Sequence, residues 1–119
     1  TCLTRKYDFS AAHRPYNPDY TDEQNWAVFG LCNNPNGHGH NYEIEITLTG
    51  ESDPVTGMLV NIVELDEWVK QDIIRHVDHK HLNLDVPFFK GINPTAENIA
   101  IVFWQQLAPR FDNQDHCRL

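Results

Sequence analysis

The feature that most restricts the fold is an alternation of apolar and polar side chains over residues 40–49. Successive side chains of a strand point to opposite faces of a sheet, so this pattern predicts a β-strand with one buried face. A chain that contains such a strand must pair it and cover its apolar side. The residues on that side are His40, Tyr42, Ile44, Ile46 and Leu48.

Two further strands are predicted around this one. Residues 7–13 alternate in the same way and end on the apolar side with a histidine, the apolar positions being Tyr7, Phe9, Ala11 and His13. Residues 50–57 contain a proline and a glycine suited to a turn. Residues 58–60 are therefore expected to return as the short second arm of a hairpin.

Two amphipathic helices are predicted in the second half. Asn61 can cap the first, which extends to about His76, and the second begins near Thr95 and stops at Pro109. Apolar residues recur in both at helical spacing. They are Ile62, Leu65, Trp68, Val69 and Ile73 in the first helix, and Ala96, Ile99, Ala100, Phe103 and Leu107 in the second.

The remaining segments carry weaker signals. Residues 14–37 show no sustained period and are predicted to form a long loop, which in a compact domain is usually functional. No strand is predicted after Pro109. The 119 residues are expected to form one domain, residues 1–119. Because the predicted strands make a marginal sheet for two helices, we expect other subunits, or strands absent from this chain, to complete it.

Composition excludes several classes of function. The formal net charge of −8 argues against binding to nucleic acid or to an anionic membrane, since both require a basic surface. No apolar run of 18 residues is present, so neither a transmembrane helix nor a signal peptide is expected. Three cysteines without CxxC spacing fit a reducing compartment, so a cytoplasmic location is expected.

Three histidines form a candidate metal site. His38 and His40 stand two positions apart at the start of the predicted strand, so both would project to one face. His13, on a paired strand, could supply a third imidazole. Three neutral imidazoles at about 2.0–2.1 Å are a recognised ligand set for catalytic zinc. Individually each histidine could be a hydrogen-bonded boundary residue, whereas together they favour zinc.

A second group of histidines competes with the first. His76, His79 and His81 lie around the end of the first helix, where a cation near the helix C-terminus is one explanation for His76. Their spacing does not place them on one helical face. Asp78 precedes His79, and a carboxylate that orients an imidazole is typical of acid–base chemistry.

Cys32 lies in the predicted loop, six positions before His38. A free cysteine is most often buried and inert. Near zinc or an imidazolium its pKa would fall, and the thiolate could act as a base or nucleophile. As a fourth ligand it would instead close a structural zinc site. The residues alone leave these alternatives open.

Five segments in order resemble the 6-pyruvoyl-tetrahydropterin synthase family of the tunnelling-fold superfamily. They are FSAAHR (9–14), LCNNPNGHGHNYE (31–43), DPVTGMLVN (53–61), VDHKHLNLDVPFF (77–89) and PTAENIA (94–100). The resemblance implies zinc (Zn²⁺) held by His13, His38 and His40. It also implies that Cys32 is the general base, assisted by Asp78 and His79 of a neighbouring subunit.

The resemblance further implies a carbon–oxygen lyase that acts on a pterin triphosphate. Enzymes of this family convert 7,8-dihydroneopterin triphosphate into 6-pyruvoyl-tetrahydropterin with loss of triphosphate. Thr95 and Glu97 match a stretch that helps hold the pterin ring, although Thr95 could equally be a helix cap and Glu97 a carboxylate that complements the helix dipole. Arg14 and Lys80 are near the motifs, but each could be a solvated charge.

The implied fold is α+β: an antiparallel sheet with two helices packed on one face. Three subunits would join their sheets into a barrel, and two trimers would stack into a hexamer, which removes exposed strand edges. The family continues past the second helix with two more strands, the last bearing a glutamate that anchors the pterin. The resemblance therefore implies that the chain is C-terminally incomplete relative to this pattern.

Two other functions compete with this one. A 6-carboxytetrahydropterin synthase of queuosine biosynthesis shares the implied fold, substrate and zinc, but typically has a shorter gap between the cysteine and the HxH pair. A non-catalytic zinc-binding scaffold, in which Cys32 closes the site, belongs to another class. The five residues between Cys32 and His38 favour the pyruvoyl product.

Overall fold

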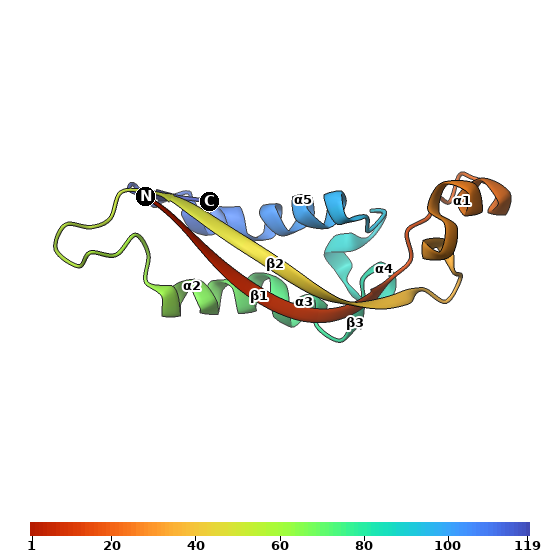
Figure 1. Cartoon of the computed structure of the whole chain (residues 1–119), viewed down its shortest axis with the longest axis horizontal. Coiled ribbons are helices and arrows are strands. Elements are labelled where there is room, and N and C mark those ends of the chain that lie inside the picture. Colours follow the sequence, from red (N-terminus) through yellow and green to blue (C-terminus); the bar gives the residue numbers. More distant parts are fainter.

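A long pair of antiparallel strands is the central element of the fold. The computed structural model describes all residues, 1–119. Strands β1 (Cys2–His13) and β2 (His38–Gly50) pair antiparallel without interruption, from Cys2 opposite Thr49 to His13 opposite His38. Figure 1 shows the pair running diagonally through the molecule. The two predicted strands are confirmed, and β1 begins five residues earlier than expected because its first half is partly exposed and lacks a regular apolar pattern.

Two short strands complete a four-stranded sheet in the order β3-β1-β2-β4. β3 (Lys80–His81) lies parallel to β1, and β4 (Cys117–Arg118) lies antiparallel to β2. The sheet is therefore mixed, and the expectation of an antiparallel sheet was wrong for β3. β3 follows the helix that ends at Val77 after only two residues, and it runs in the same direction as β1.

The expectation of no strand after Pro109 was also wrong. β4 pairs with Thr49 and Gly50, and a side chain at Gly50 would overlap the carbonyl oxygen of His116. Glycine therefore permits the close approach that brings β4 to the sheet. A two-residue strand is too short to leave a periodic signal in the sequence.

The predicted return strand at residues 58–60 does not form. The side chain of Asp53 accepts hydrogen bonds from the backbone N–H groups of Val55 and Thr56, at 2.7 and 3.2 Å, and closes a local turn. Because β4 already occupies the edge of β2 at Gly50, no edge is left beside it for a hairpin arm. Leu59 packs into the core instead.

The first long helix is confirmed over its whole predicted length. It comprises α2 (Ile62–Val69), a π-helical segment (Lys70–Ile74) and α3 (Arg75–Val77). The Asn61 side chain caps it by accepting from the N–H groups of Val63 and Glu64. Sequence periodicity did not indicate the π-helical segment, which widens the helix by one residue per turn.

The second long helix, α5 (Ala96–Leu107), follows its predicted course. The Thr95 hydroxyl caps it by accepting from the N–H of Asn98 at 3.3 Å, and a 3₁₀ turn (Ala108–Phe111) ends it around Pro109. Between the two long helices lie α4 (Leu82–Asp85) and a 3₁₀ turn (Pro87–Phe89).

The segment predicted to be a long loop contains a helix. α1 (Asp22–Phe29) is followed by a 3₁₀ turn (Gly30–Asn33). Asn25 is the only buried residue of α1, so the helix has no apolar stripe and its periodicity could not be detected. A capping box between Thr21 and Gln24 starts it, and this T-x-x-Q pattern is the signal that could have revealed it.

The hydrophobic core lies on one face of the hairpin, beneath both long helices. Odd-numbered residues of β1 and even-numbered residues of β2 share this face, and the ring of Phe9 meets that of Phe103 of α5 with centroids 5.7 Å apart. The predicted covering of one face by two helices therefore agrees with the burial. Buried core residues include Phe9, Ala11, Ile46 and Leu48 from the sheet, Leu65, Val69, Ile73 and Val77 from the first helix, and Ile99, Val102, Phe103 and Leu107 from α5.

The molecule is elongated, with extents of 60 × 22 × 20 Å and a radius of gyration of 17.1 Å. A compact chain of this length would have a radius of gyration of about 13.5 Å. Both termini lie at one end and α1 lies at the other (Figure 1). None of the helices has the length and apolar character needed to cross a membrane.

The core predicts a clear contrast between two leucines. Leu65 is fully buried and Leu84 is 78% exposed. Leu65→Ala should lower the free energy of unfolding by about 2–5 kcal/mol, because it removes buried methyl groups and leaves a cavity. Leu84→Ala, the matched control, should change it by less than about 0.5 kcal/mol. Urea denaturation measures both, and equal effects would contradict this description of the core.

Candidate metal site

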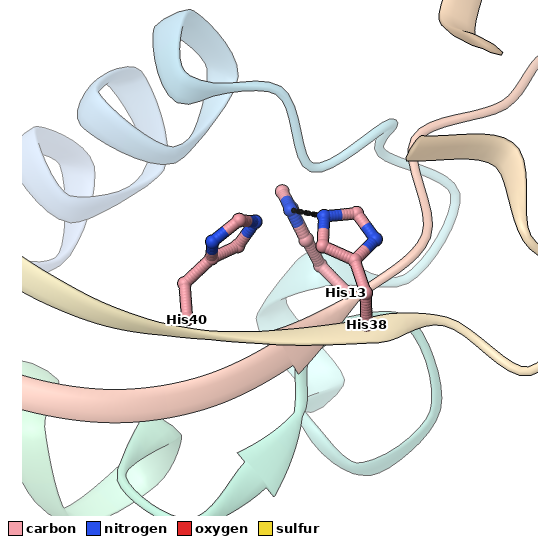
Figure 2. A group of neighbouring side chains, drawn as sticks. All are labelled: His13, His38 and His40. Carbon is pink, nitrogen blue, oxygen red and sulfur yellow. Dashed lines mark hydrogen bonds between the residues drawn. The ribbon is translucent and has the colours of Figure 1, made fainter. Parts of the chain in front are cut away.

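The register of the hairpin gathers three histidines on one face. His13 lies opposite His38, and His40 lies opposite Ala11, so all three side chains point to the same side of the sheet. Figure 2 shows the three imidazoles rising together from the two strands. One ring nitrogen of each lies within 4.8 Å of those of the other two. The predicted trio is therefore assembled by strand pairing alone.

The hydrogen bonds of His13 select the tautomer that a metal requires. Its Nδ1 lies 2.7 Å from the carbonyl oxygen of Pro94. A carbonyl can only accept, so Nδ1 carries the proton and Nε2 of the neutral ring presents a lone pair. This nitrogen lies 3.0 Å from Nε2 of His38. Metal-bound histidines commonly donate their other N–H to a backbone carbonyl in this way.

The distance between Nε2 of His13 and Nε2 of His38 also suits two ligands of one zinc ion. Two nitrogens bound to one tetrahedral zinc would be about 3.3 Å apart, from bond lengths of about 2.0–2.1 Å. The distance of 3.0 Å between His13 and His38 is close to this value. His13 and His38 therefore already have the spacing of two ligands of one ion, and the ligand nitrogens of all three histidines lie within 4.8 Å of one another.

Burial lowers the pKa of two of these rings. The pKa of His13 is lowered chiefly by burial, against the hydrogen bond to Pro94, and the neighbouring histidines lower it further. The pKa of His38 is lowered by burial and then by His40. A lowered pKa favours the neutral imidazole at pH 7, which is the form that binds metals.

Gly37 and His81 shape the opposite side of the site. Gly37 has a φ of +75°, and a Cβ there would lie 2.6 Å from Nε2 of His81 and 3.1 Å from the backbone oxygen of His13. Glycine is therefore required by both conformation and space. His81 pairs with Ala12, so its ring lies on the face away from the trio. The sequence placed His81 in a rival metal group and missed this packing role.

The rival histidines do not converge. His76 packs its ring against Phe88, with centroids 5.5 Å apart, and the His79 side chain is 82% exposed. The only group of side chains in the chain that could hold a metal ion is His13, His38 and His40. Cys32 is exposed on the 3₁₀ turn after α1 and is not part of this group.

Asp78 and His79 form a pair of their own beside β1. Oδ1 of Asp78 lies 3.1 Å from Nδ1 of His79 and accepts from the N–H of Ser10 at 3.0 Å. The pKa of Asp78 is lowered first by this bond from Ser10 and also by His79. Ser10 lies on the face of β1 opposite His13, and no hydrogen bond joins the pair to the histidine trio within the chain.

The backbone of His79 is held in an uncommon conformation. Its φ of 61° lies in the left-handed region, which costs a residue with a side chain roughly 1–2 kcal/mol. Its N–H donates to the carbonyl of Ser10 at 2.6 Å, which ties the turn to β1. Such conformations persist where the surrounding structure fixes them, and they cluster at functional sites.

Thr95 and Glu97 lie at the start of α5, directly after Pro94, which contacts His13 of the trio. Thr95 follows Pro94, whose carbonyl receives the His13 ring, and its hydroxyl serves as the helix cap. Glu97 is exposed in the first turn. The helix-cap reading of Thr95 is confirmed, and it does not exclude a second contact made by the same residue.

Comparison with known proteins identifies relatives over most of the chain. Residues 2–119 match the family described as 6-pyruvoyl tetrahydropterin synthase. The human 6-pyruvoyl tetrahydrobiopterin synthase is 46% identical over 105 residues, which cover 88% of this chain and 72% of the human protein. A 6-carboxy-5,6,7,8-tetrahydropterin synthase of Rickettsia typhi is 28% identical, covering 90% of this chain and 80% of that protein.

A solved structure has the same fold. The 6-pyruvoyl tetrahydropterin synthase of Caenorhabditis elegans superposes with a TM-score of 0.89 at 40% identity, covering 95% of this chain and 80% of that one. The family resemblance inferred from the motifs is confirmed by sequence and by fold. The chain belongs to the 6-pyruvoyl tetrahydropterin synthase family.

Proposed function

We propose that the protein is a 6-pyruvoyl-tetrahydropterin synthase, a lyase that removes triphosphate from 7,8-dihydroneopterin triphosphate. The observation that carries this proposal is the histidine trio, a three-nitrogen metal site in a chain of this family. Identity to the human pyruvoyl enzyme is 46%, against 28% to the Rickettsia carboxy enzyme, and this supports the pyruvoyl product.

The proposed metal is zinc, held by His13, His38 and His40. Three imidazoles are the ligand set of many catalytic zinc sites, which keep a fourth position for water or substrate. When bound, zinc would supply Lewis-acid chemistry to the hydroxyl groups of the substrate side chain and make nearby protons easier to remove. The exclusion of Cys32 from the ligand group supports a catalytic site over a closed structural one.

The proposed proton carriers are Cys32, Asp78 and His79. The Cys32 thiolate would remove a proton from the substrate side chain, and the C–O bond to the triphosphate would break in the elimination. Asp78 orients the His79 ring, so this ring is prepared to return or relay a proton. Its 82% exposure leaves the ring free to reach another subunit.

A shared site requires an assembly, and we propose a hexamer built from two trimers. β3 covers only Ala11 and Ala12 of β1, and β4 covers only Thr49 and Gly50 of β2. Both hairpin edges are otherwise unpaired within the chain, and unpaired edges favour association with other strands. Joining the sheets of three subunits into a barrel would remove these edges.

The start of α5 is the proposed pterin contact. Thr95 and Glu97 lie next to Pro94, which holds His13, so a pterin ring bound there would adjoin the metal site. The exposed Glu97 carboxylate could accept hydrogen bonds from the amino groups of a pterin.

The proposed reaction is tested by product analysis. Zinc-loaded protein incubated with 7,8-dihydroneopterin triphosphate should release triphosphate and form 6-pyruvoyl-tetrahydropterin, identified by mass spectrometry. Protein carrying His38→Ala should lose activity and bound zinc together, because two histidines hold the ion less tightly. A 6-carboxy product would assign the protein to the queuosine branch, and no turnover would contradict the proposal.

A second experiment separates base from ligand. Cys32→Ala should lower kcat by roughly 10²–10⁴-fold, the usual contribution of a general base, and leave the zinc content unchanged. Cys2→Ala is the matched control, because Cys2 is also exposed but lies at the far end of β1. Zinc analysis and steady-state kinetics provide the readouts. Loss of zinc from the Cys32 variant would identify a ligand instead of a base.

Subunit mixing tests whether the site is shared. Cys32→Ala and His79→Ala should each be inactive alone. Co-expressed, they should regain a fraction of wild-type activity, because some sites would combine an intact Cys32 from one subunit with an intact His79 from its neighbour. Co-expression of two Cys32→Ala chains with different tags is the control. No recovery in the mixed assembly would place both groups in one chain.

A further inference from the structure

The segment that carries Cys32 leads through Gly37 into His38, and one side chain from elsewhere in the chain makes hydrogen bonds to it. Residues 30–36 hold themselves in shape by local bonds: the N–H of Asn34 donates to Leu31, the N–H of Gly37 donates to Asn34, and the Asn34 side chain accepts from Asn36. Arg14 makes the only side-chain hydrogen bonds between this segment and another part of the chain.

Arg14 donates two hydrogen bonds to Asn33. Its Nε donates to the backbone oxygen of Asn33 at 3.1 Å, and its Nη2 donates to the Asn33 side-chain oxygen at 3.0 Å. Asn33 is 7% exposed and directly follows Cys32. The face of the guanidinium lies over the Tyr16 ring, 4.1 Å from its centroid. A planar group with two fixed donors and a stacked face has little freedom to move.

The backbone of Arg14 is fixed as firmly as its side chain. The Asn83 side chain accepts from the N–H of Arg14 at 2.8 Å and donates to its carbonyl oxygen at 2.9 Å. Arg14 also follows His13, whose ring is held by Pro94. A rigid connection therefore runs from the metal-site strand through Arg14 to the residue beside Cys32.

We propose that Arg14 is a positioning residue that sets the place of Cys32 relative to the histidine trio, and that it does not bind the substrate's phosphates. The proposal rests on the proposed function, in which Cys32 is the base. The Arg14 guanidinium already donates to Asn33 and already stacks on Tyr16. A side chain that binds the substrate's phosphates needs a guanidinium that is free to turn toward the substrate.

Three variants test the hydrogen bonds between Arg14 and Asn33. Arg14→Ala and Arg14→Lys both remove the paired hydrogen bonds to Asn33, and Lys keeps the charge. Asn33→Ala removes one acceptor and leaves Arg14 in place, so it also serves if the Arg14 variants fold poorly. Arg118→Ala, a change at the exposed β4 arginine at the other end of β2, is the control.

Each variant is loaded with zinc and compared in two measurements. Amide hydrogen exchange of residues 30–36 should accelerate at least about tenfold in the two Arg14 variants, because the segment loses its only external side-chain bonds. It should accelerate less in Asn33→Ala, which keeps the bond from Nε of Arg14 to the backbone oxygen of residue 33. In steady-state kinetics kcat should fall roughly 10–100-fold with KM within about twofold, since a displaced base slows chemistry without weakening binding. Zinc content should stay at the wild-type level.

The outcomes separate the two roles. Unchanged exchange in residues 30–36, or a raised KM with unchanged kcat that Arg14→Lys restores, would overturn the proposal, the latter by identifying Arg14 as a phosphate ligand. If the wild-type protein shows no synthase activity, the proposed function fails, and the exchange measurement still decides whether Arg14 holds the segment.

Discussion

The continuous pairing of β1 with β2 is the constraint on which the rest of the structure depends. Twelve consecutive residues of β1 face partners in β2, and this register decides which side chains share a face. A shift of one residue would move every side chain of one strand to the other face. The same register buries Phe9 and Leu48 under the helices and turns His13 toward His38.

The histidine trio lies where this apolar face comes to an end. Phe9 and Tyr42 stack with ring centroids 4.8 Å apart, and the Tyr42 ring approaches those of His13 and His40 at 5.9 and 5.6 Å. The core thus supports the site from one side, and Pro94 at the start of α5 orients His13 from another. An ordered set of imidazole ligands needs this support, since loosely held ligands bind a metal weakly.

The long strands and helices were predictable because their patterns repeat. Alternation marked both strands, and apolar residues at helical spacing marked the helices that follow Asn61 and Thr95. α1, β3 and β4 were missed because each is short or lacks a buried stripe. The predicted strand at 58–60 failed for a related reason: local turn residues permit a hairpin, but β4 holds the edge that it would need.

The sequence by itself determined the two long helices and the family and offered two groups of candidate metal ligands, because helical periodicity, two-residue spacing and ordered motifs are local properties of the chain. Only the tertiary structure decided which histidines converge. His81 resembles a ligand in sequence, yet strand pairing turns its ring to the opposite face, under Gly37. The link from Arg14 to Asn33 spans 19 positions and leaves no periodic trace, because such contacts arise from folding and not from sequence spacing.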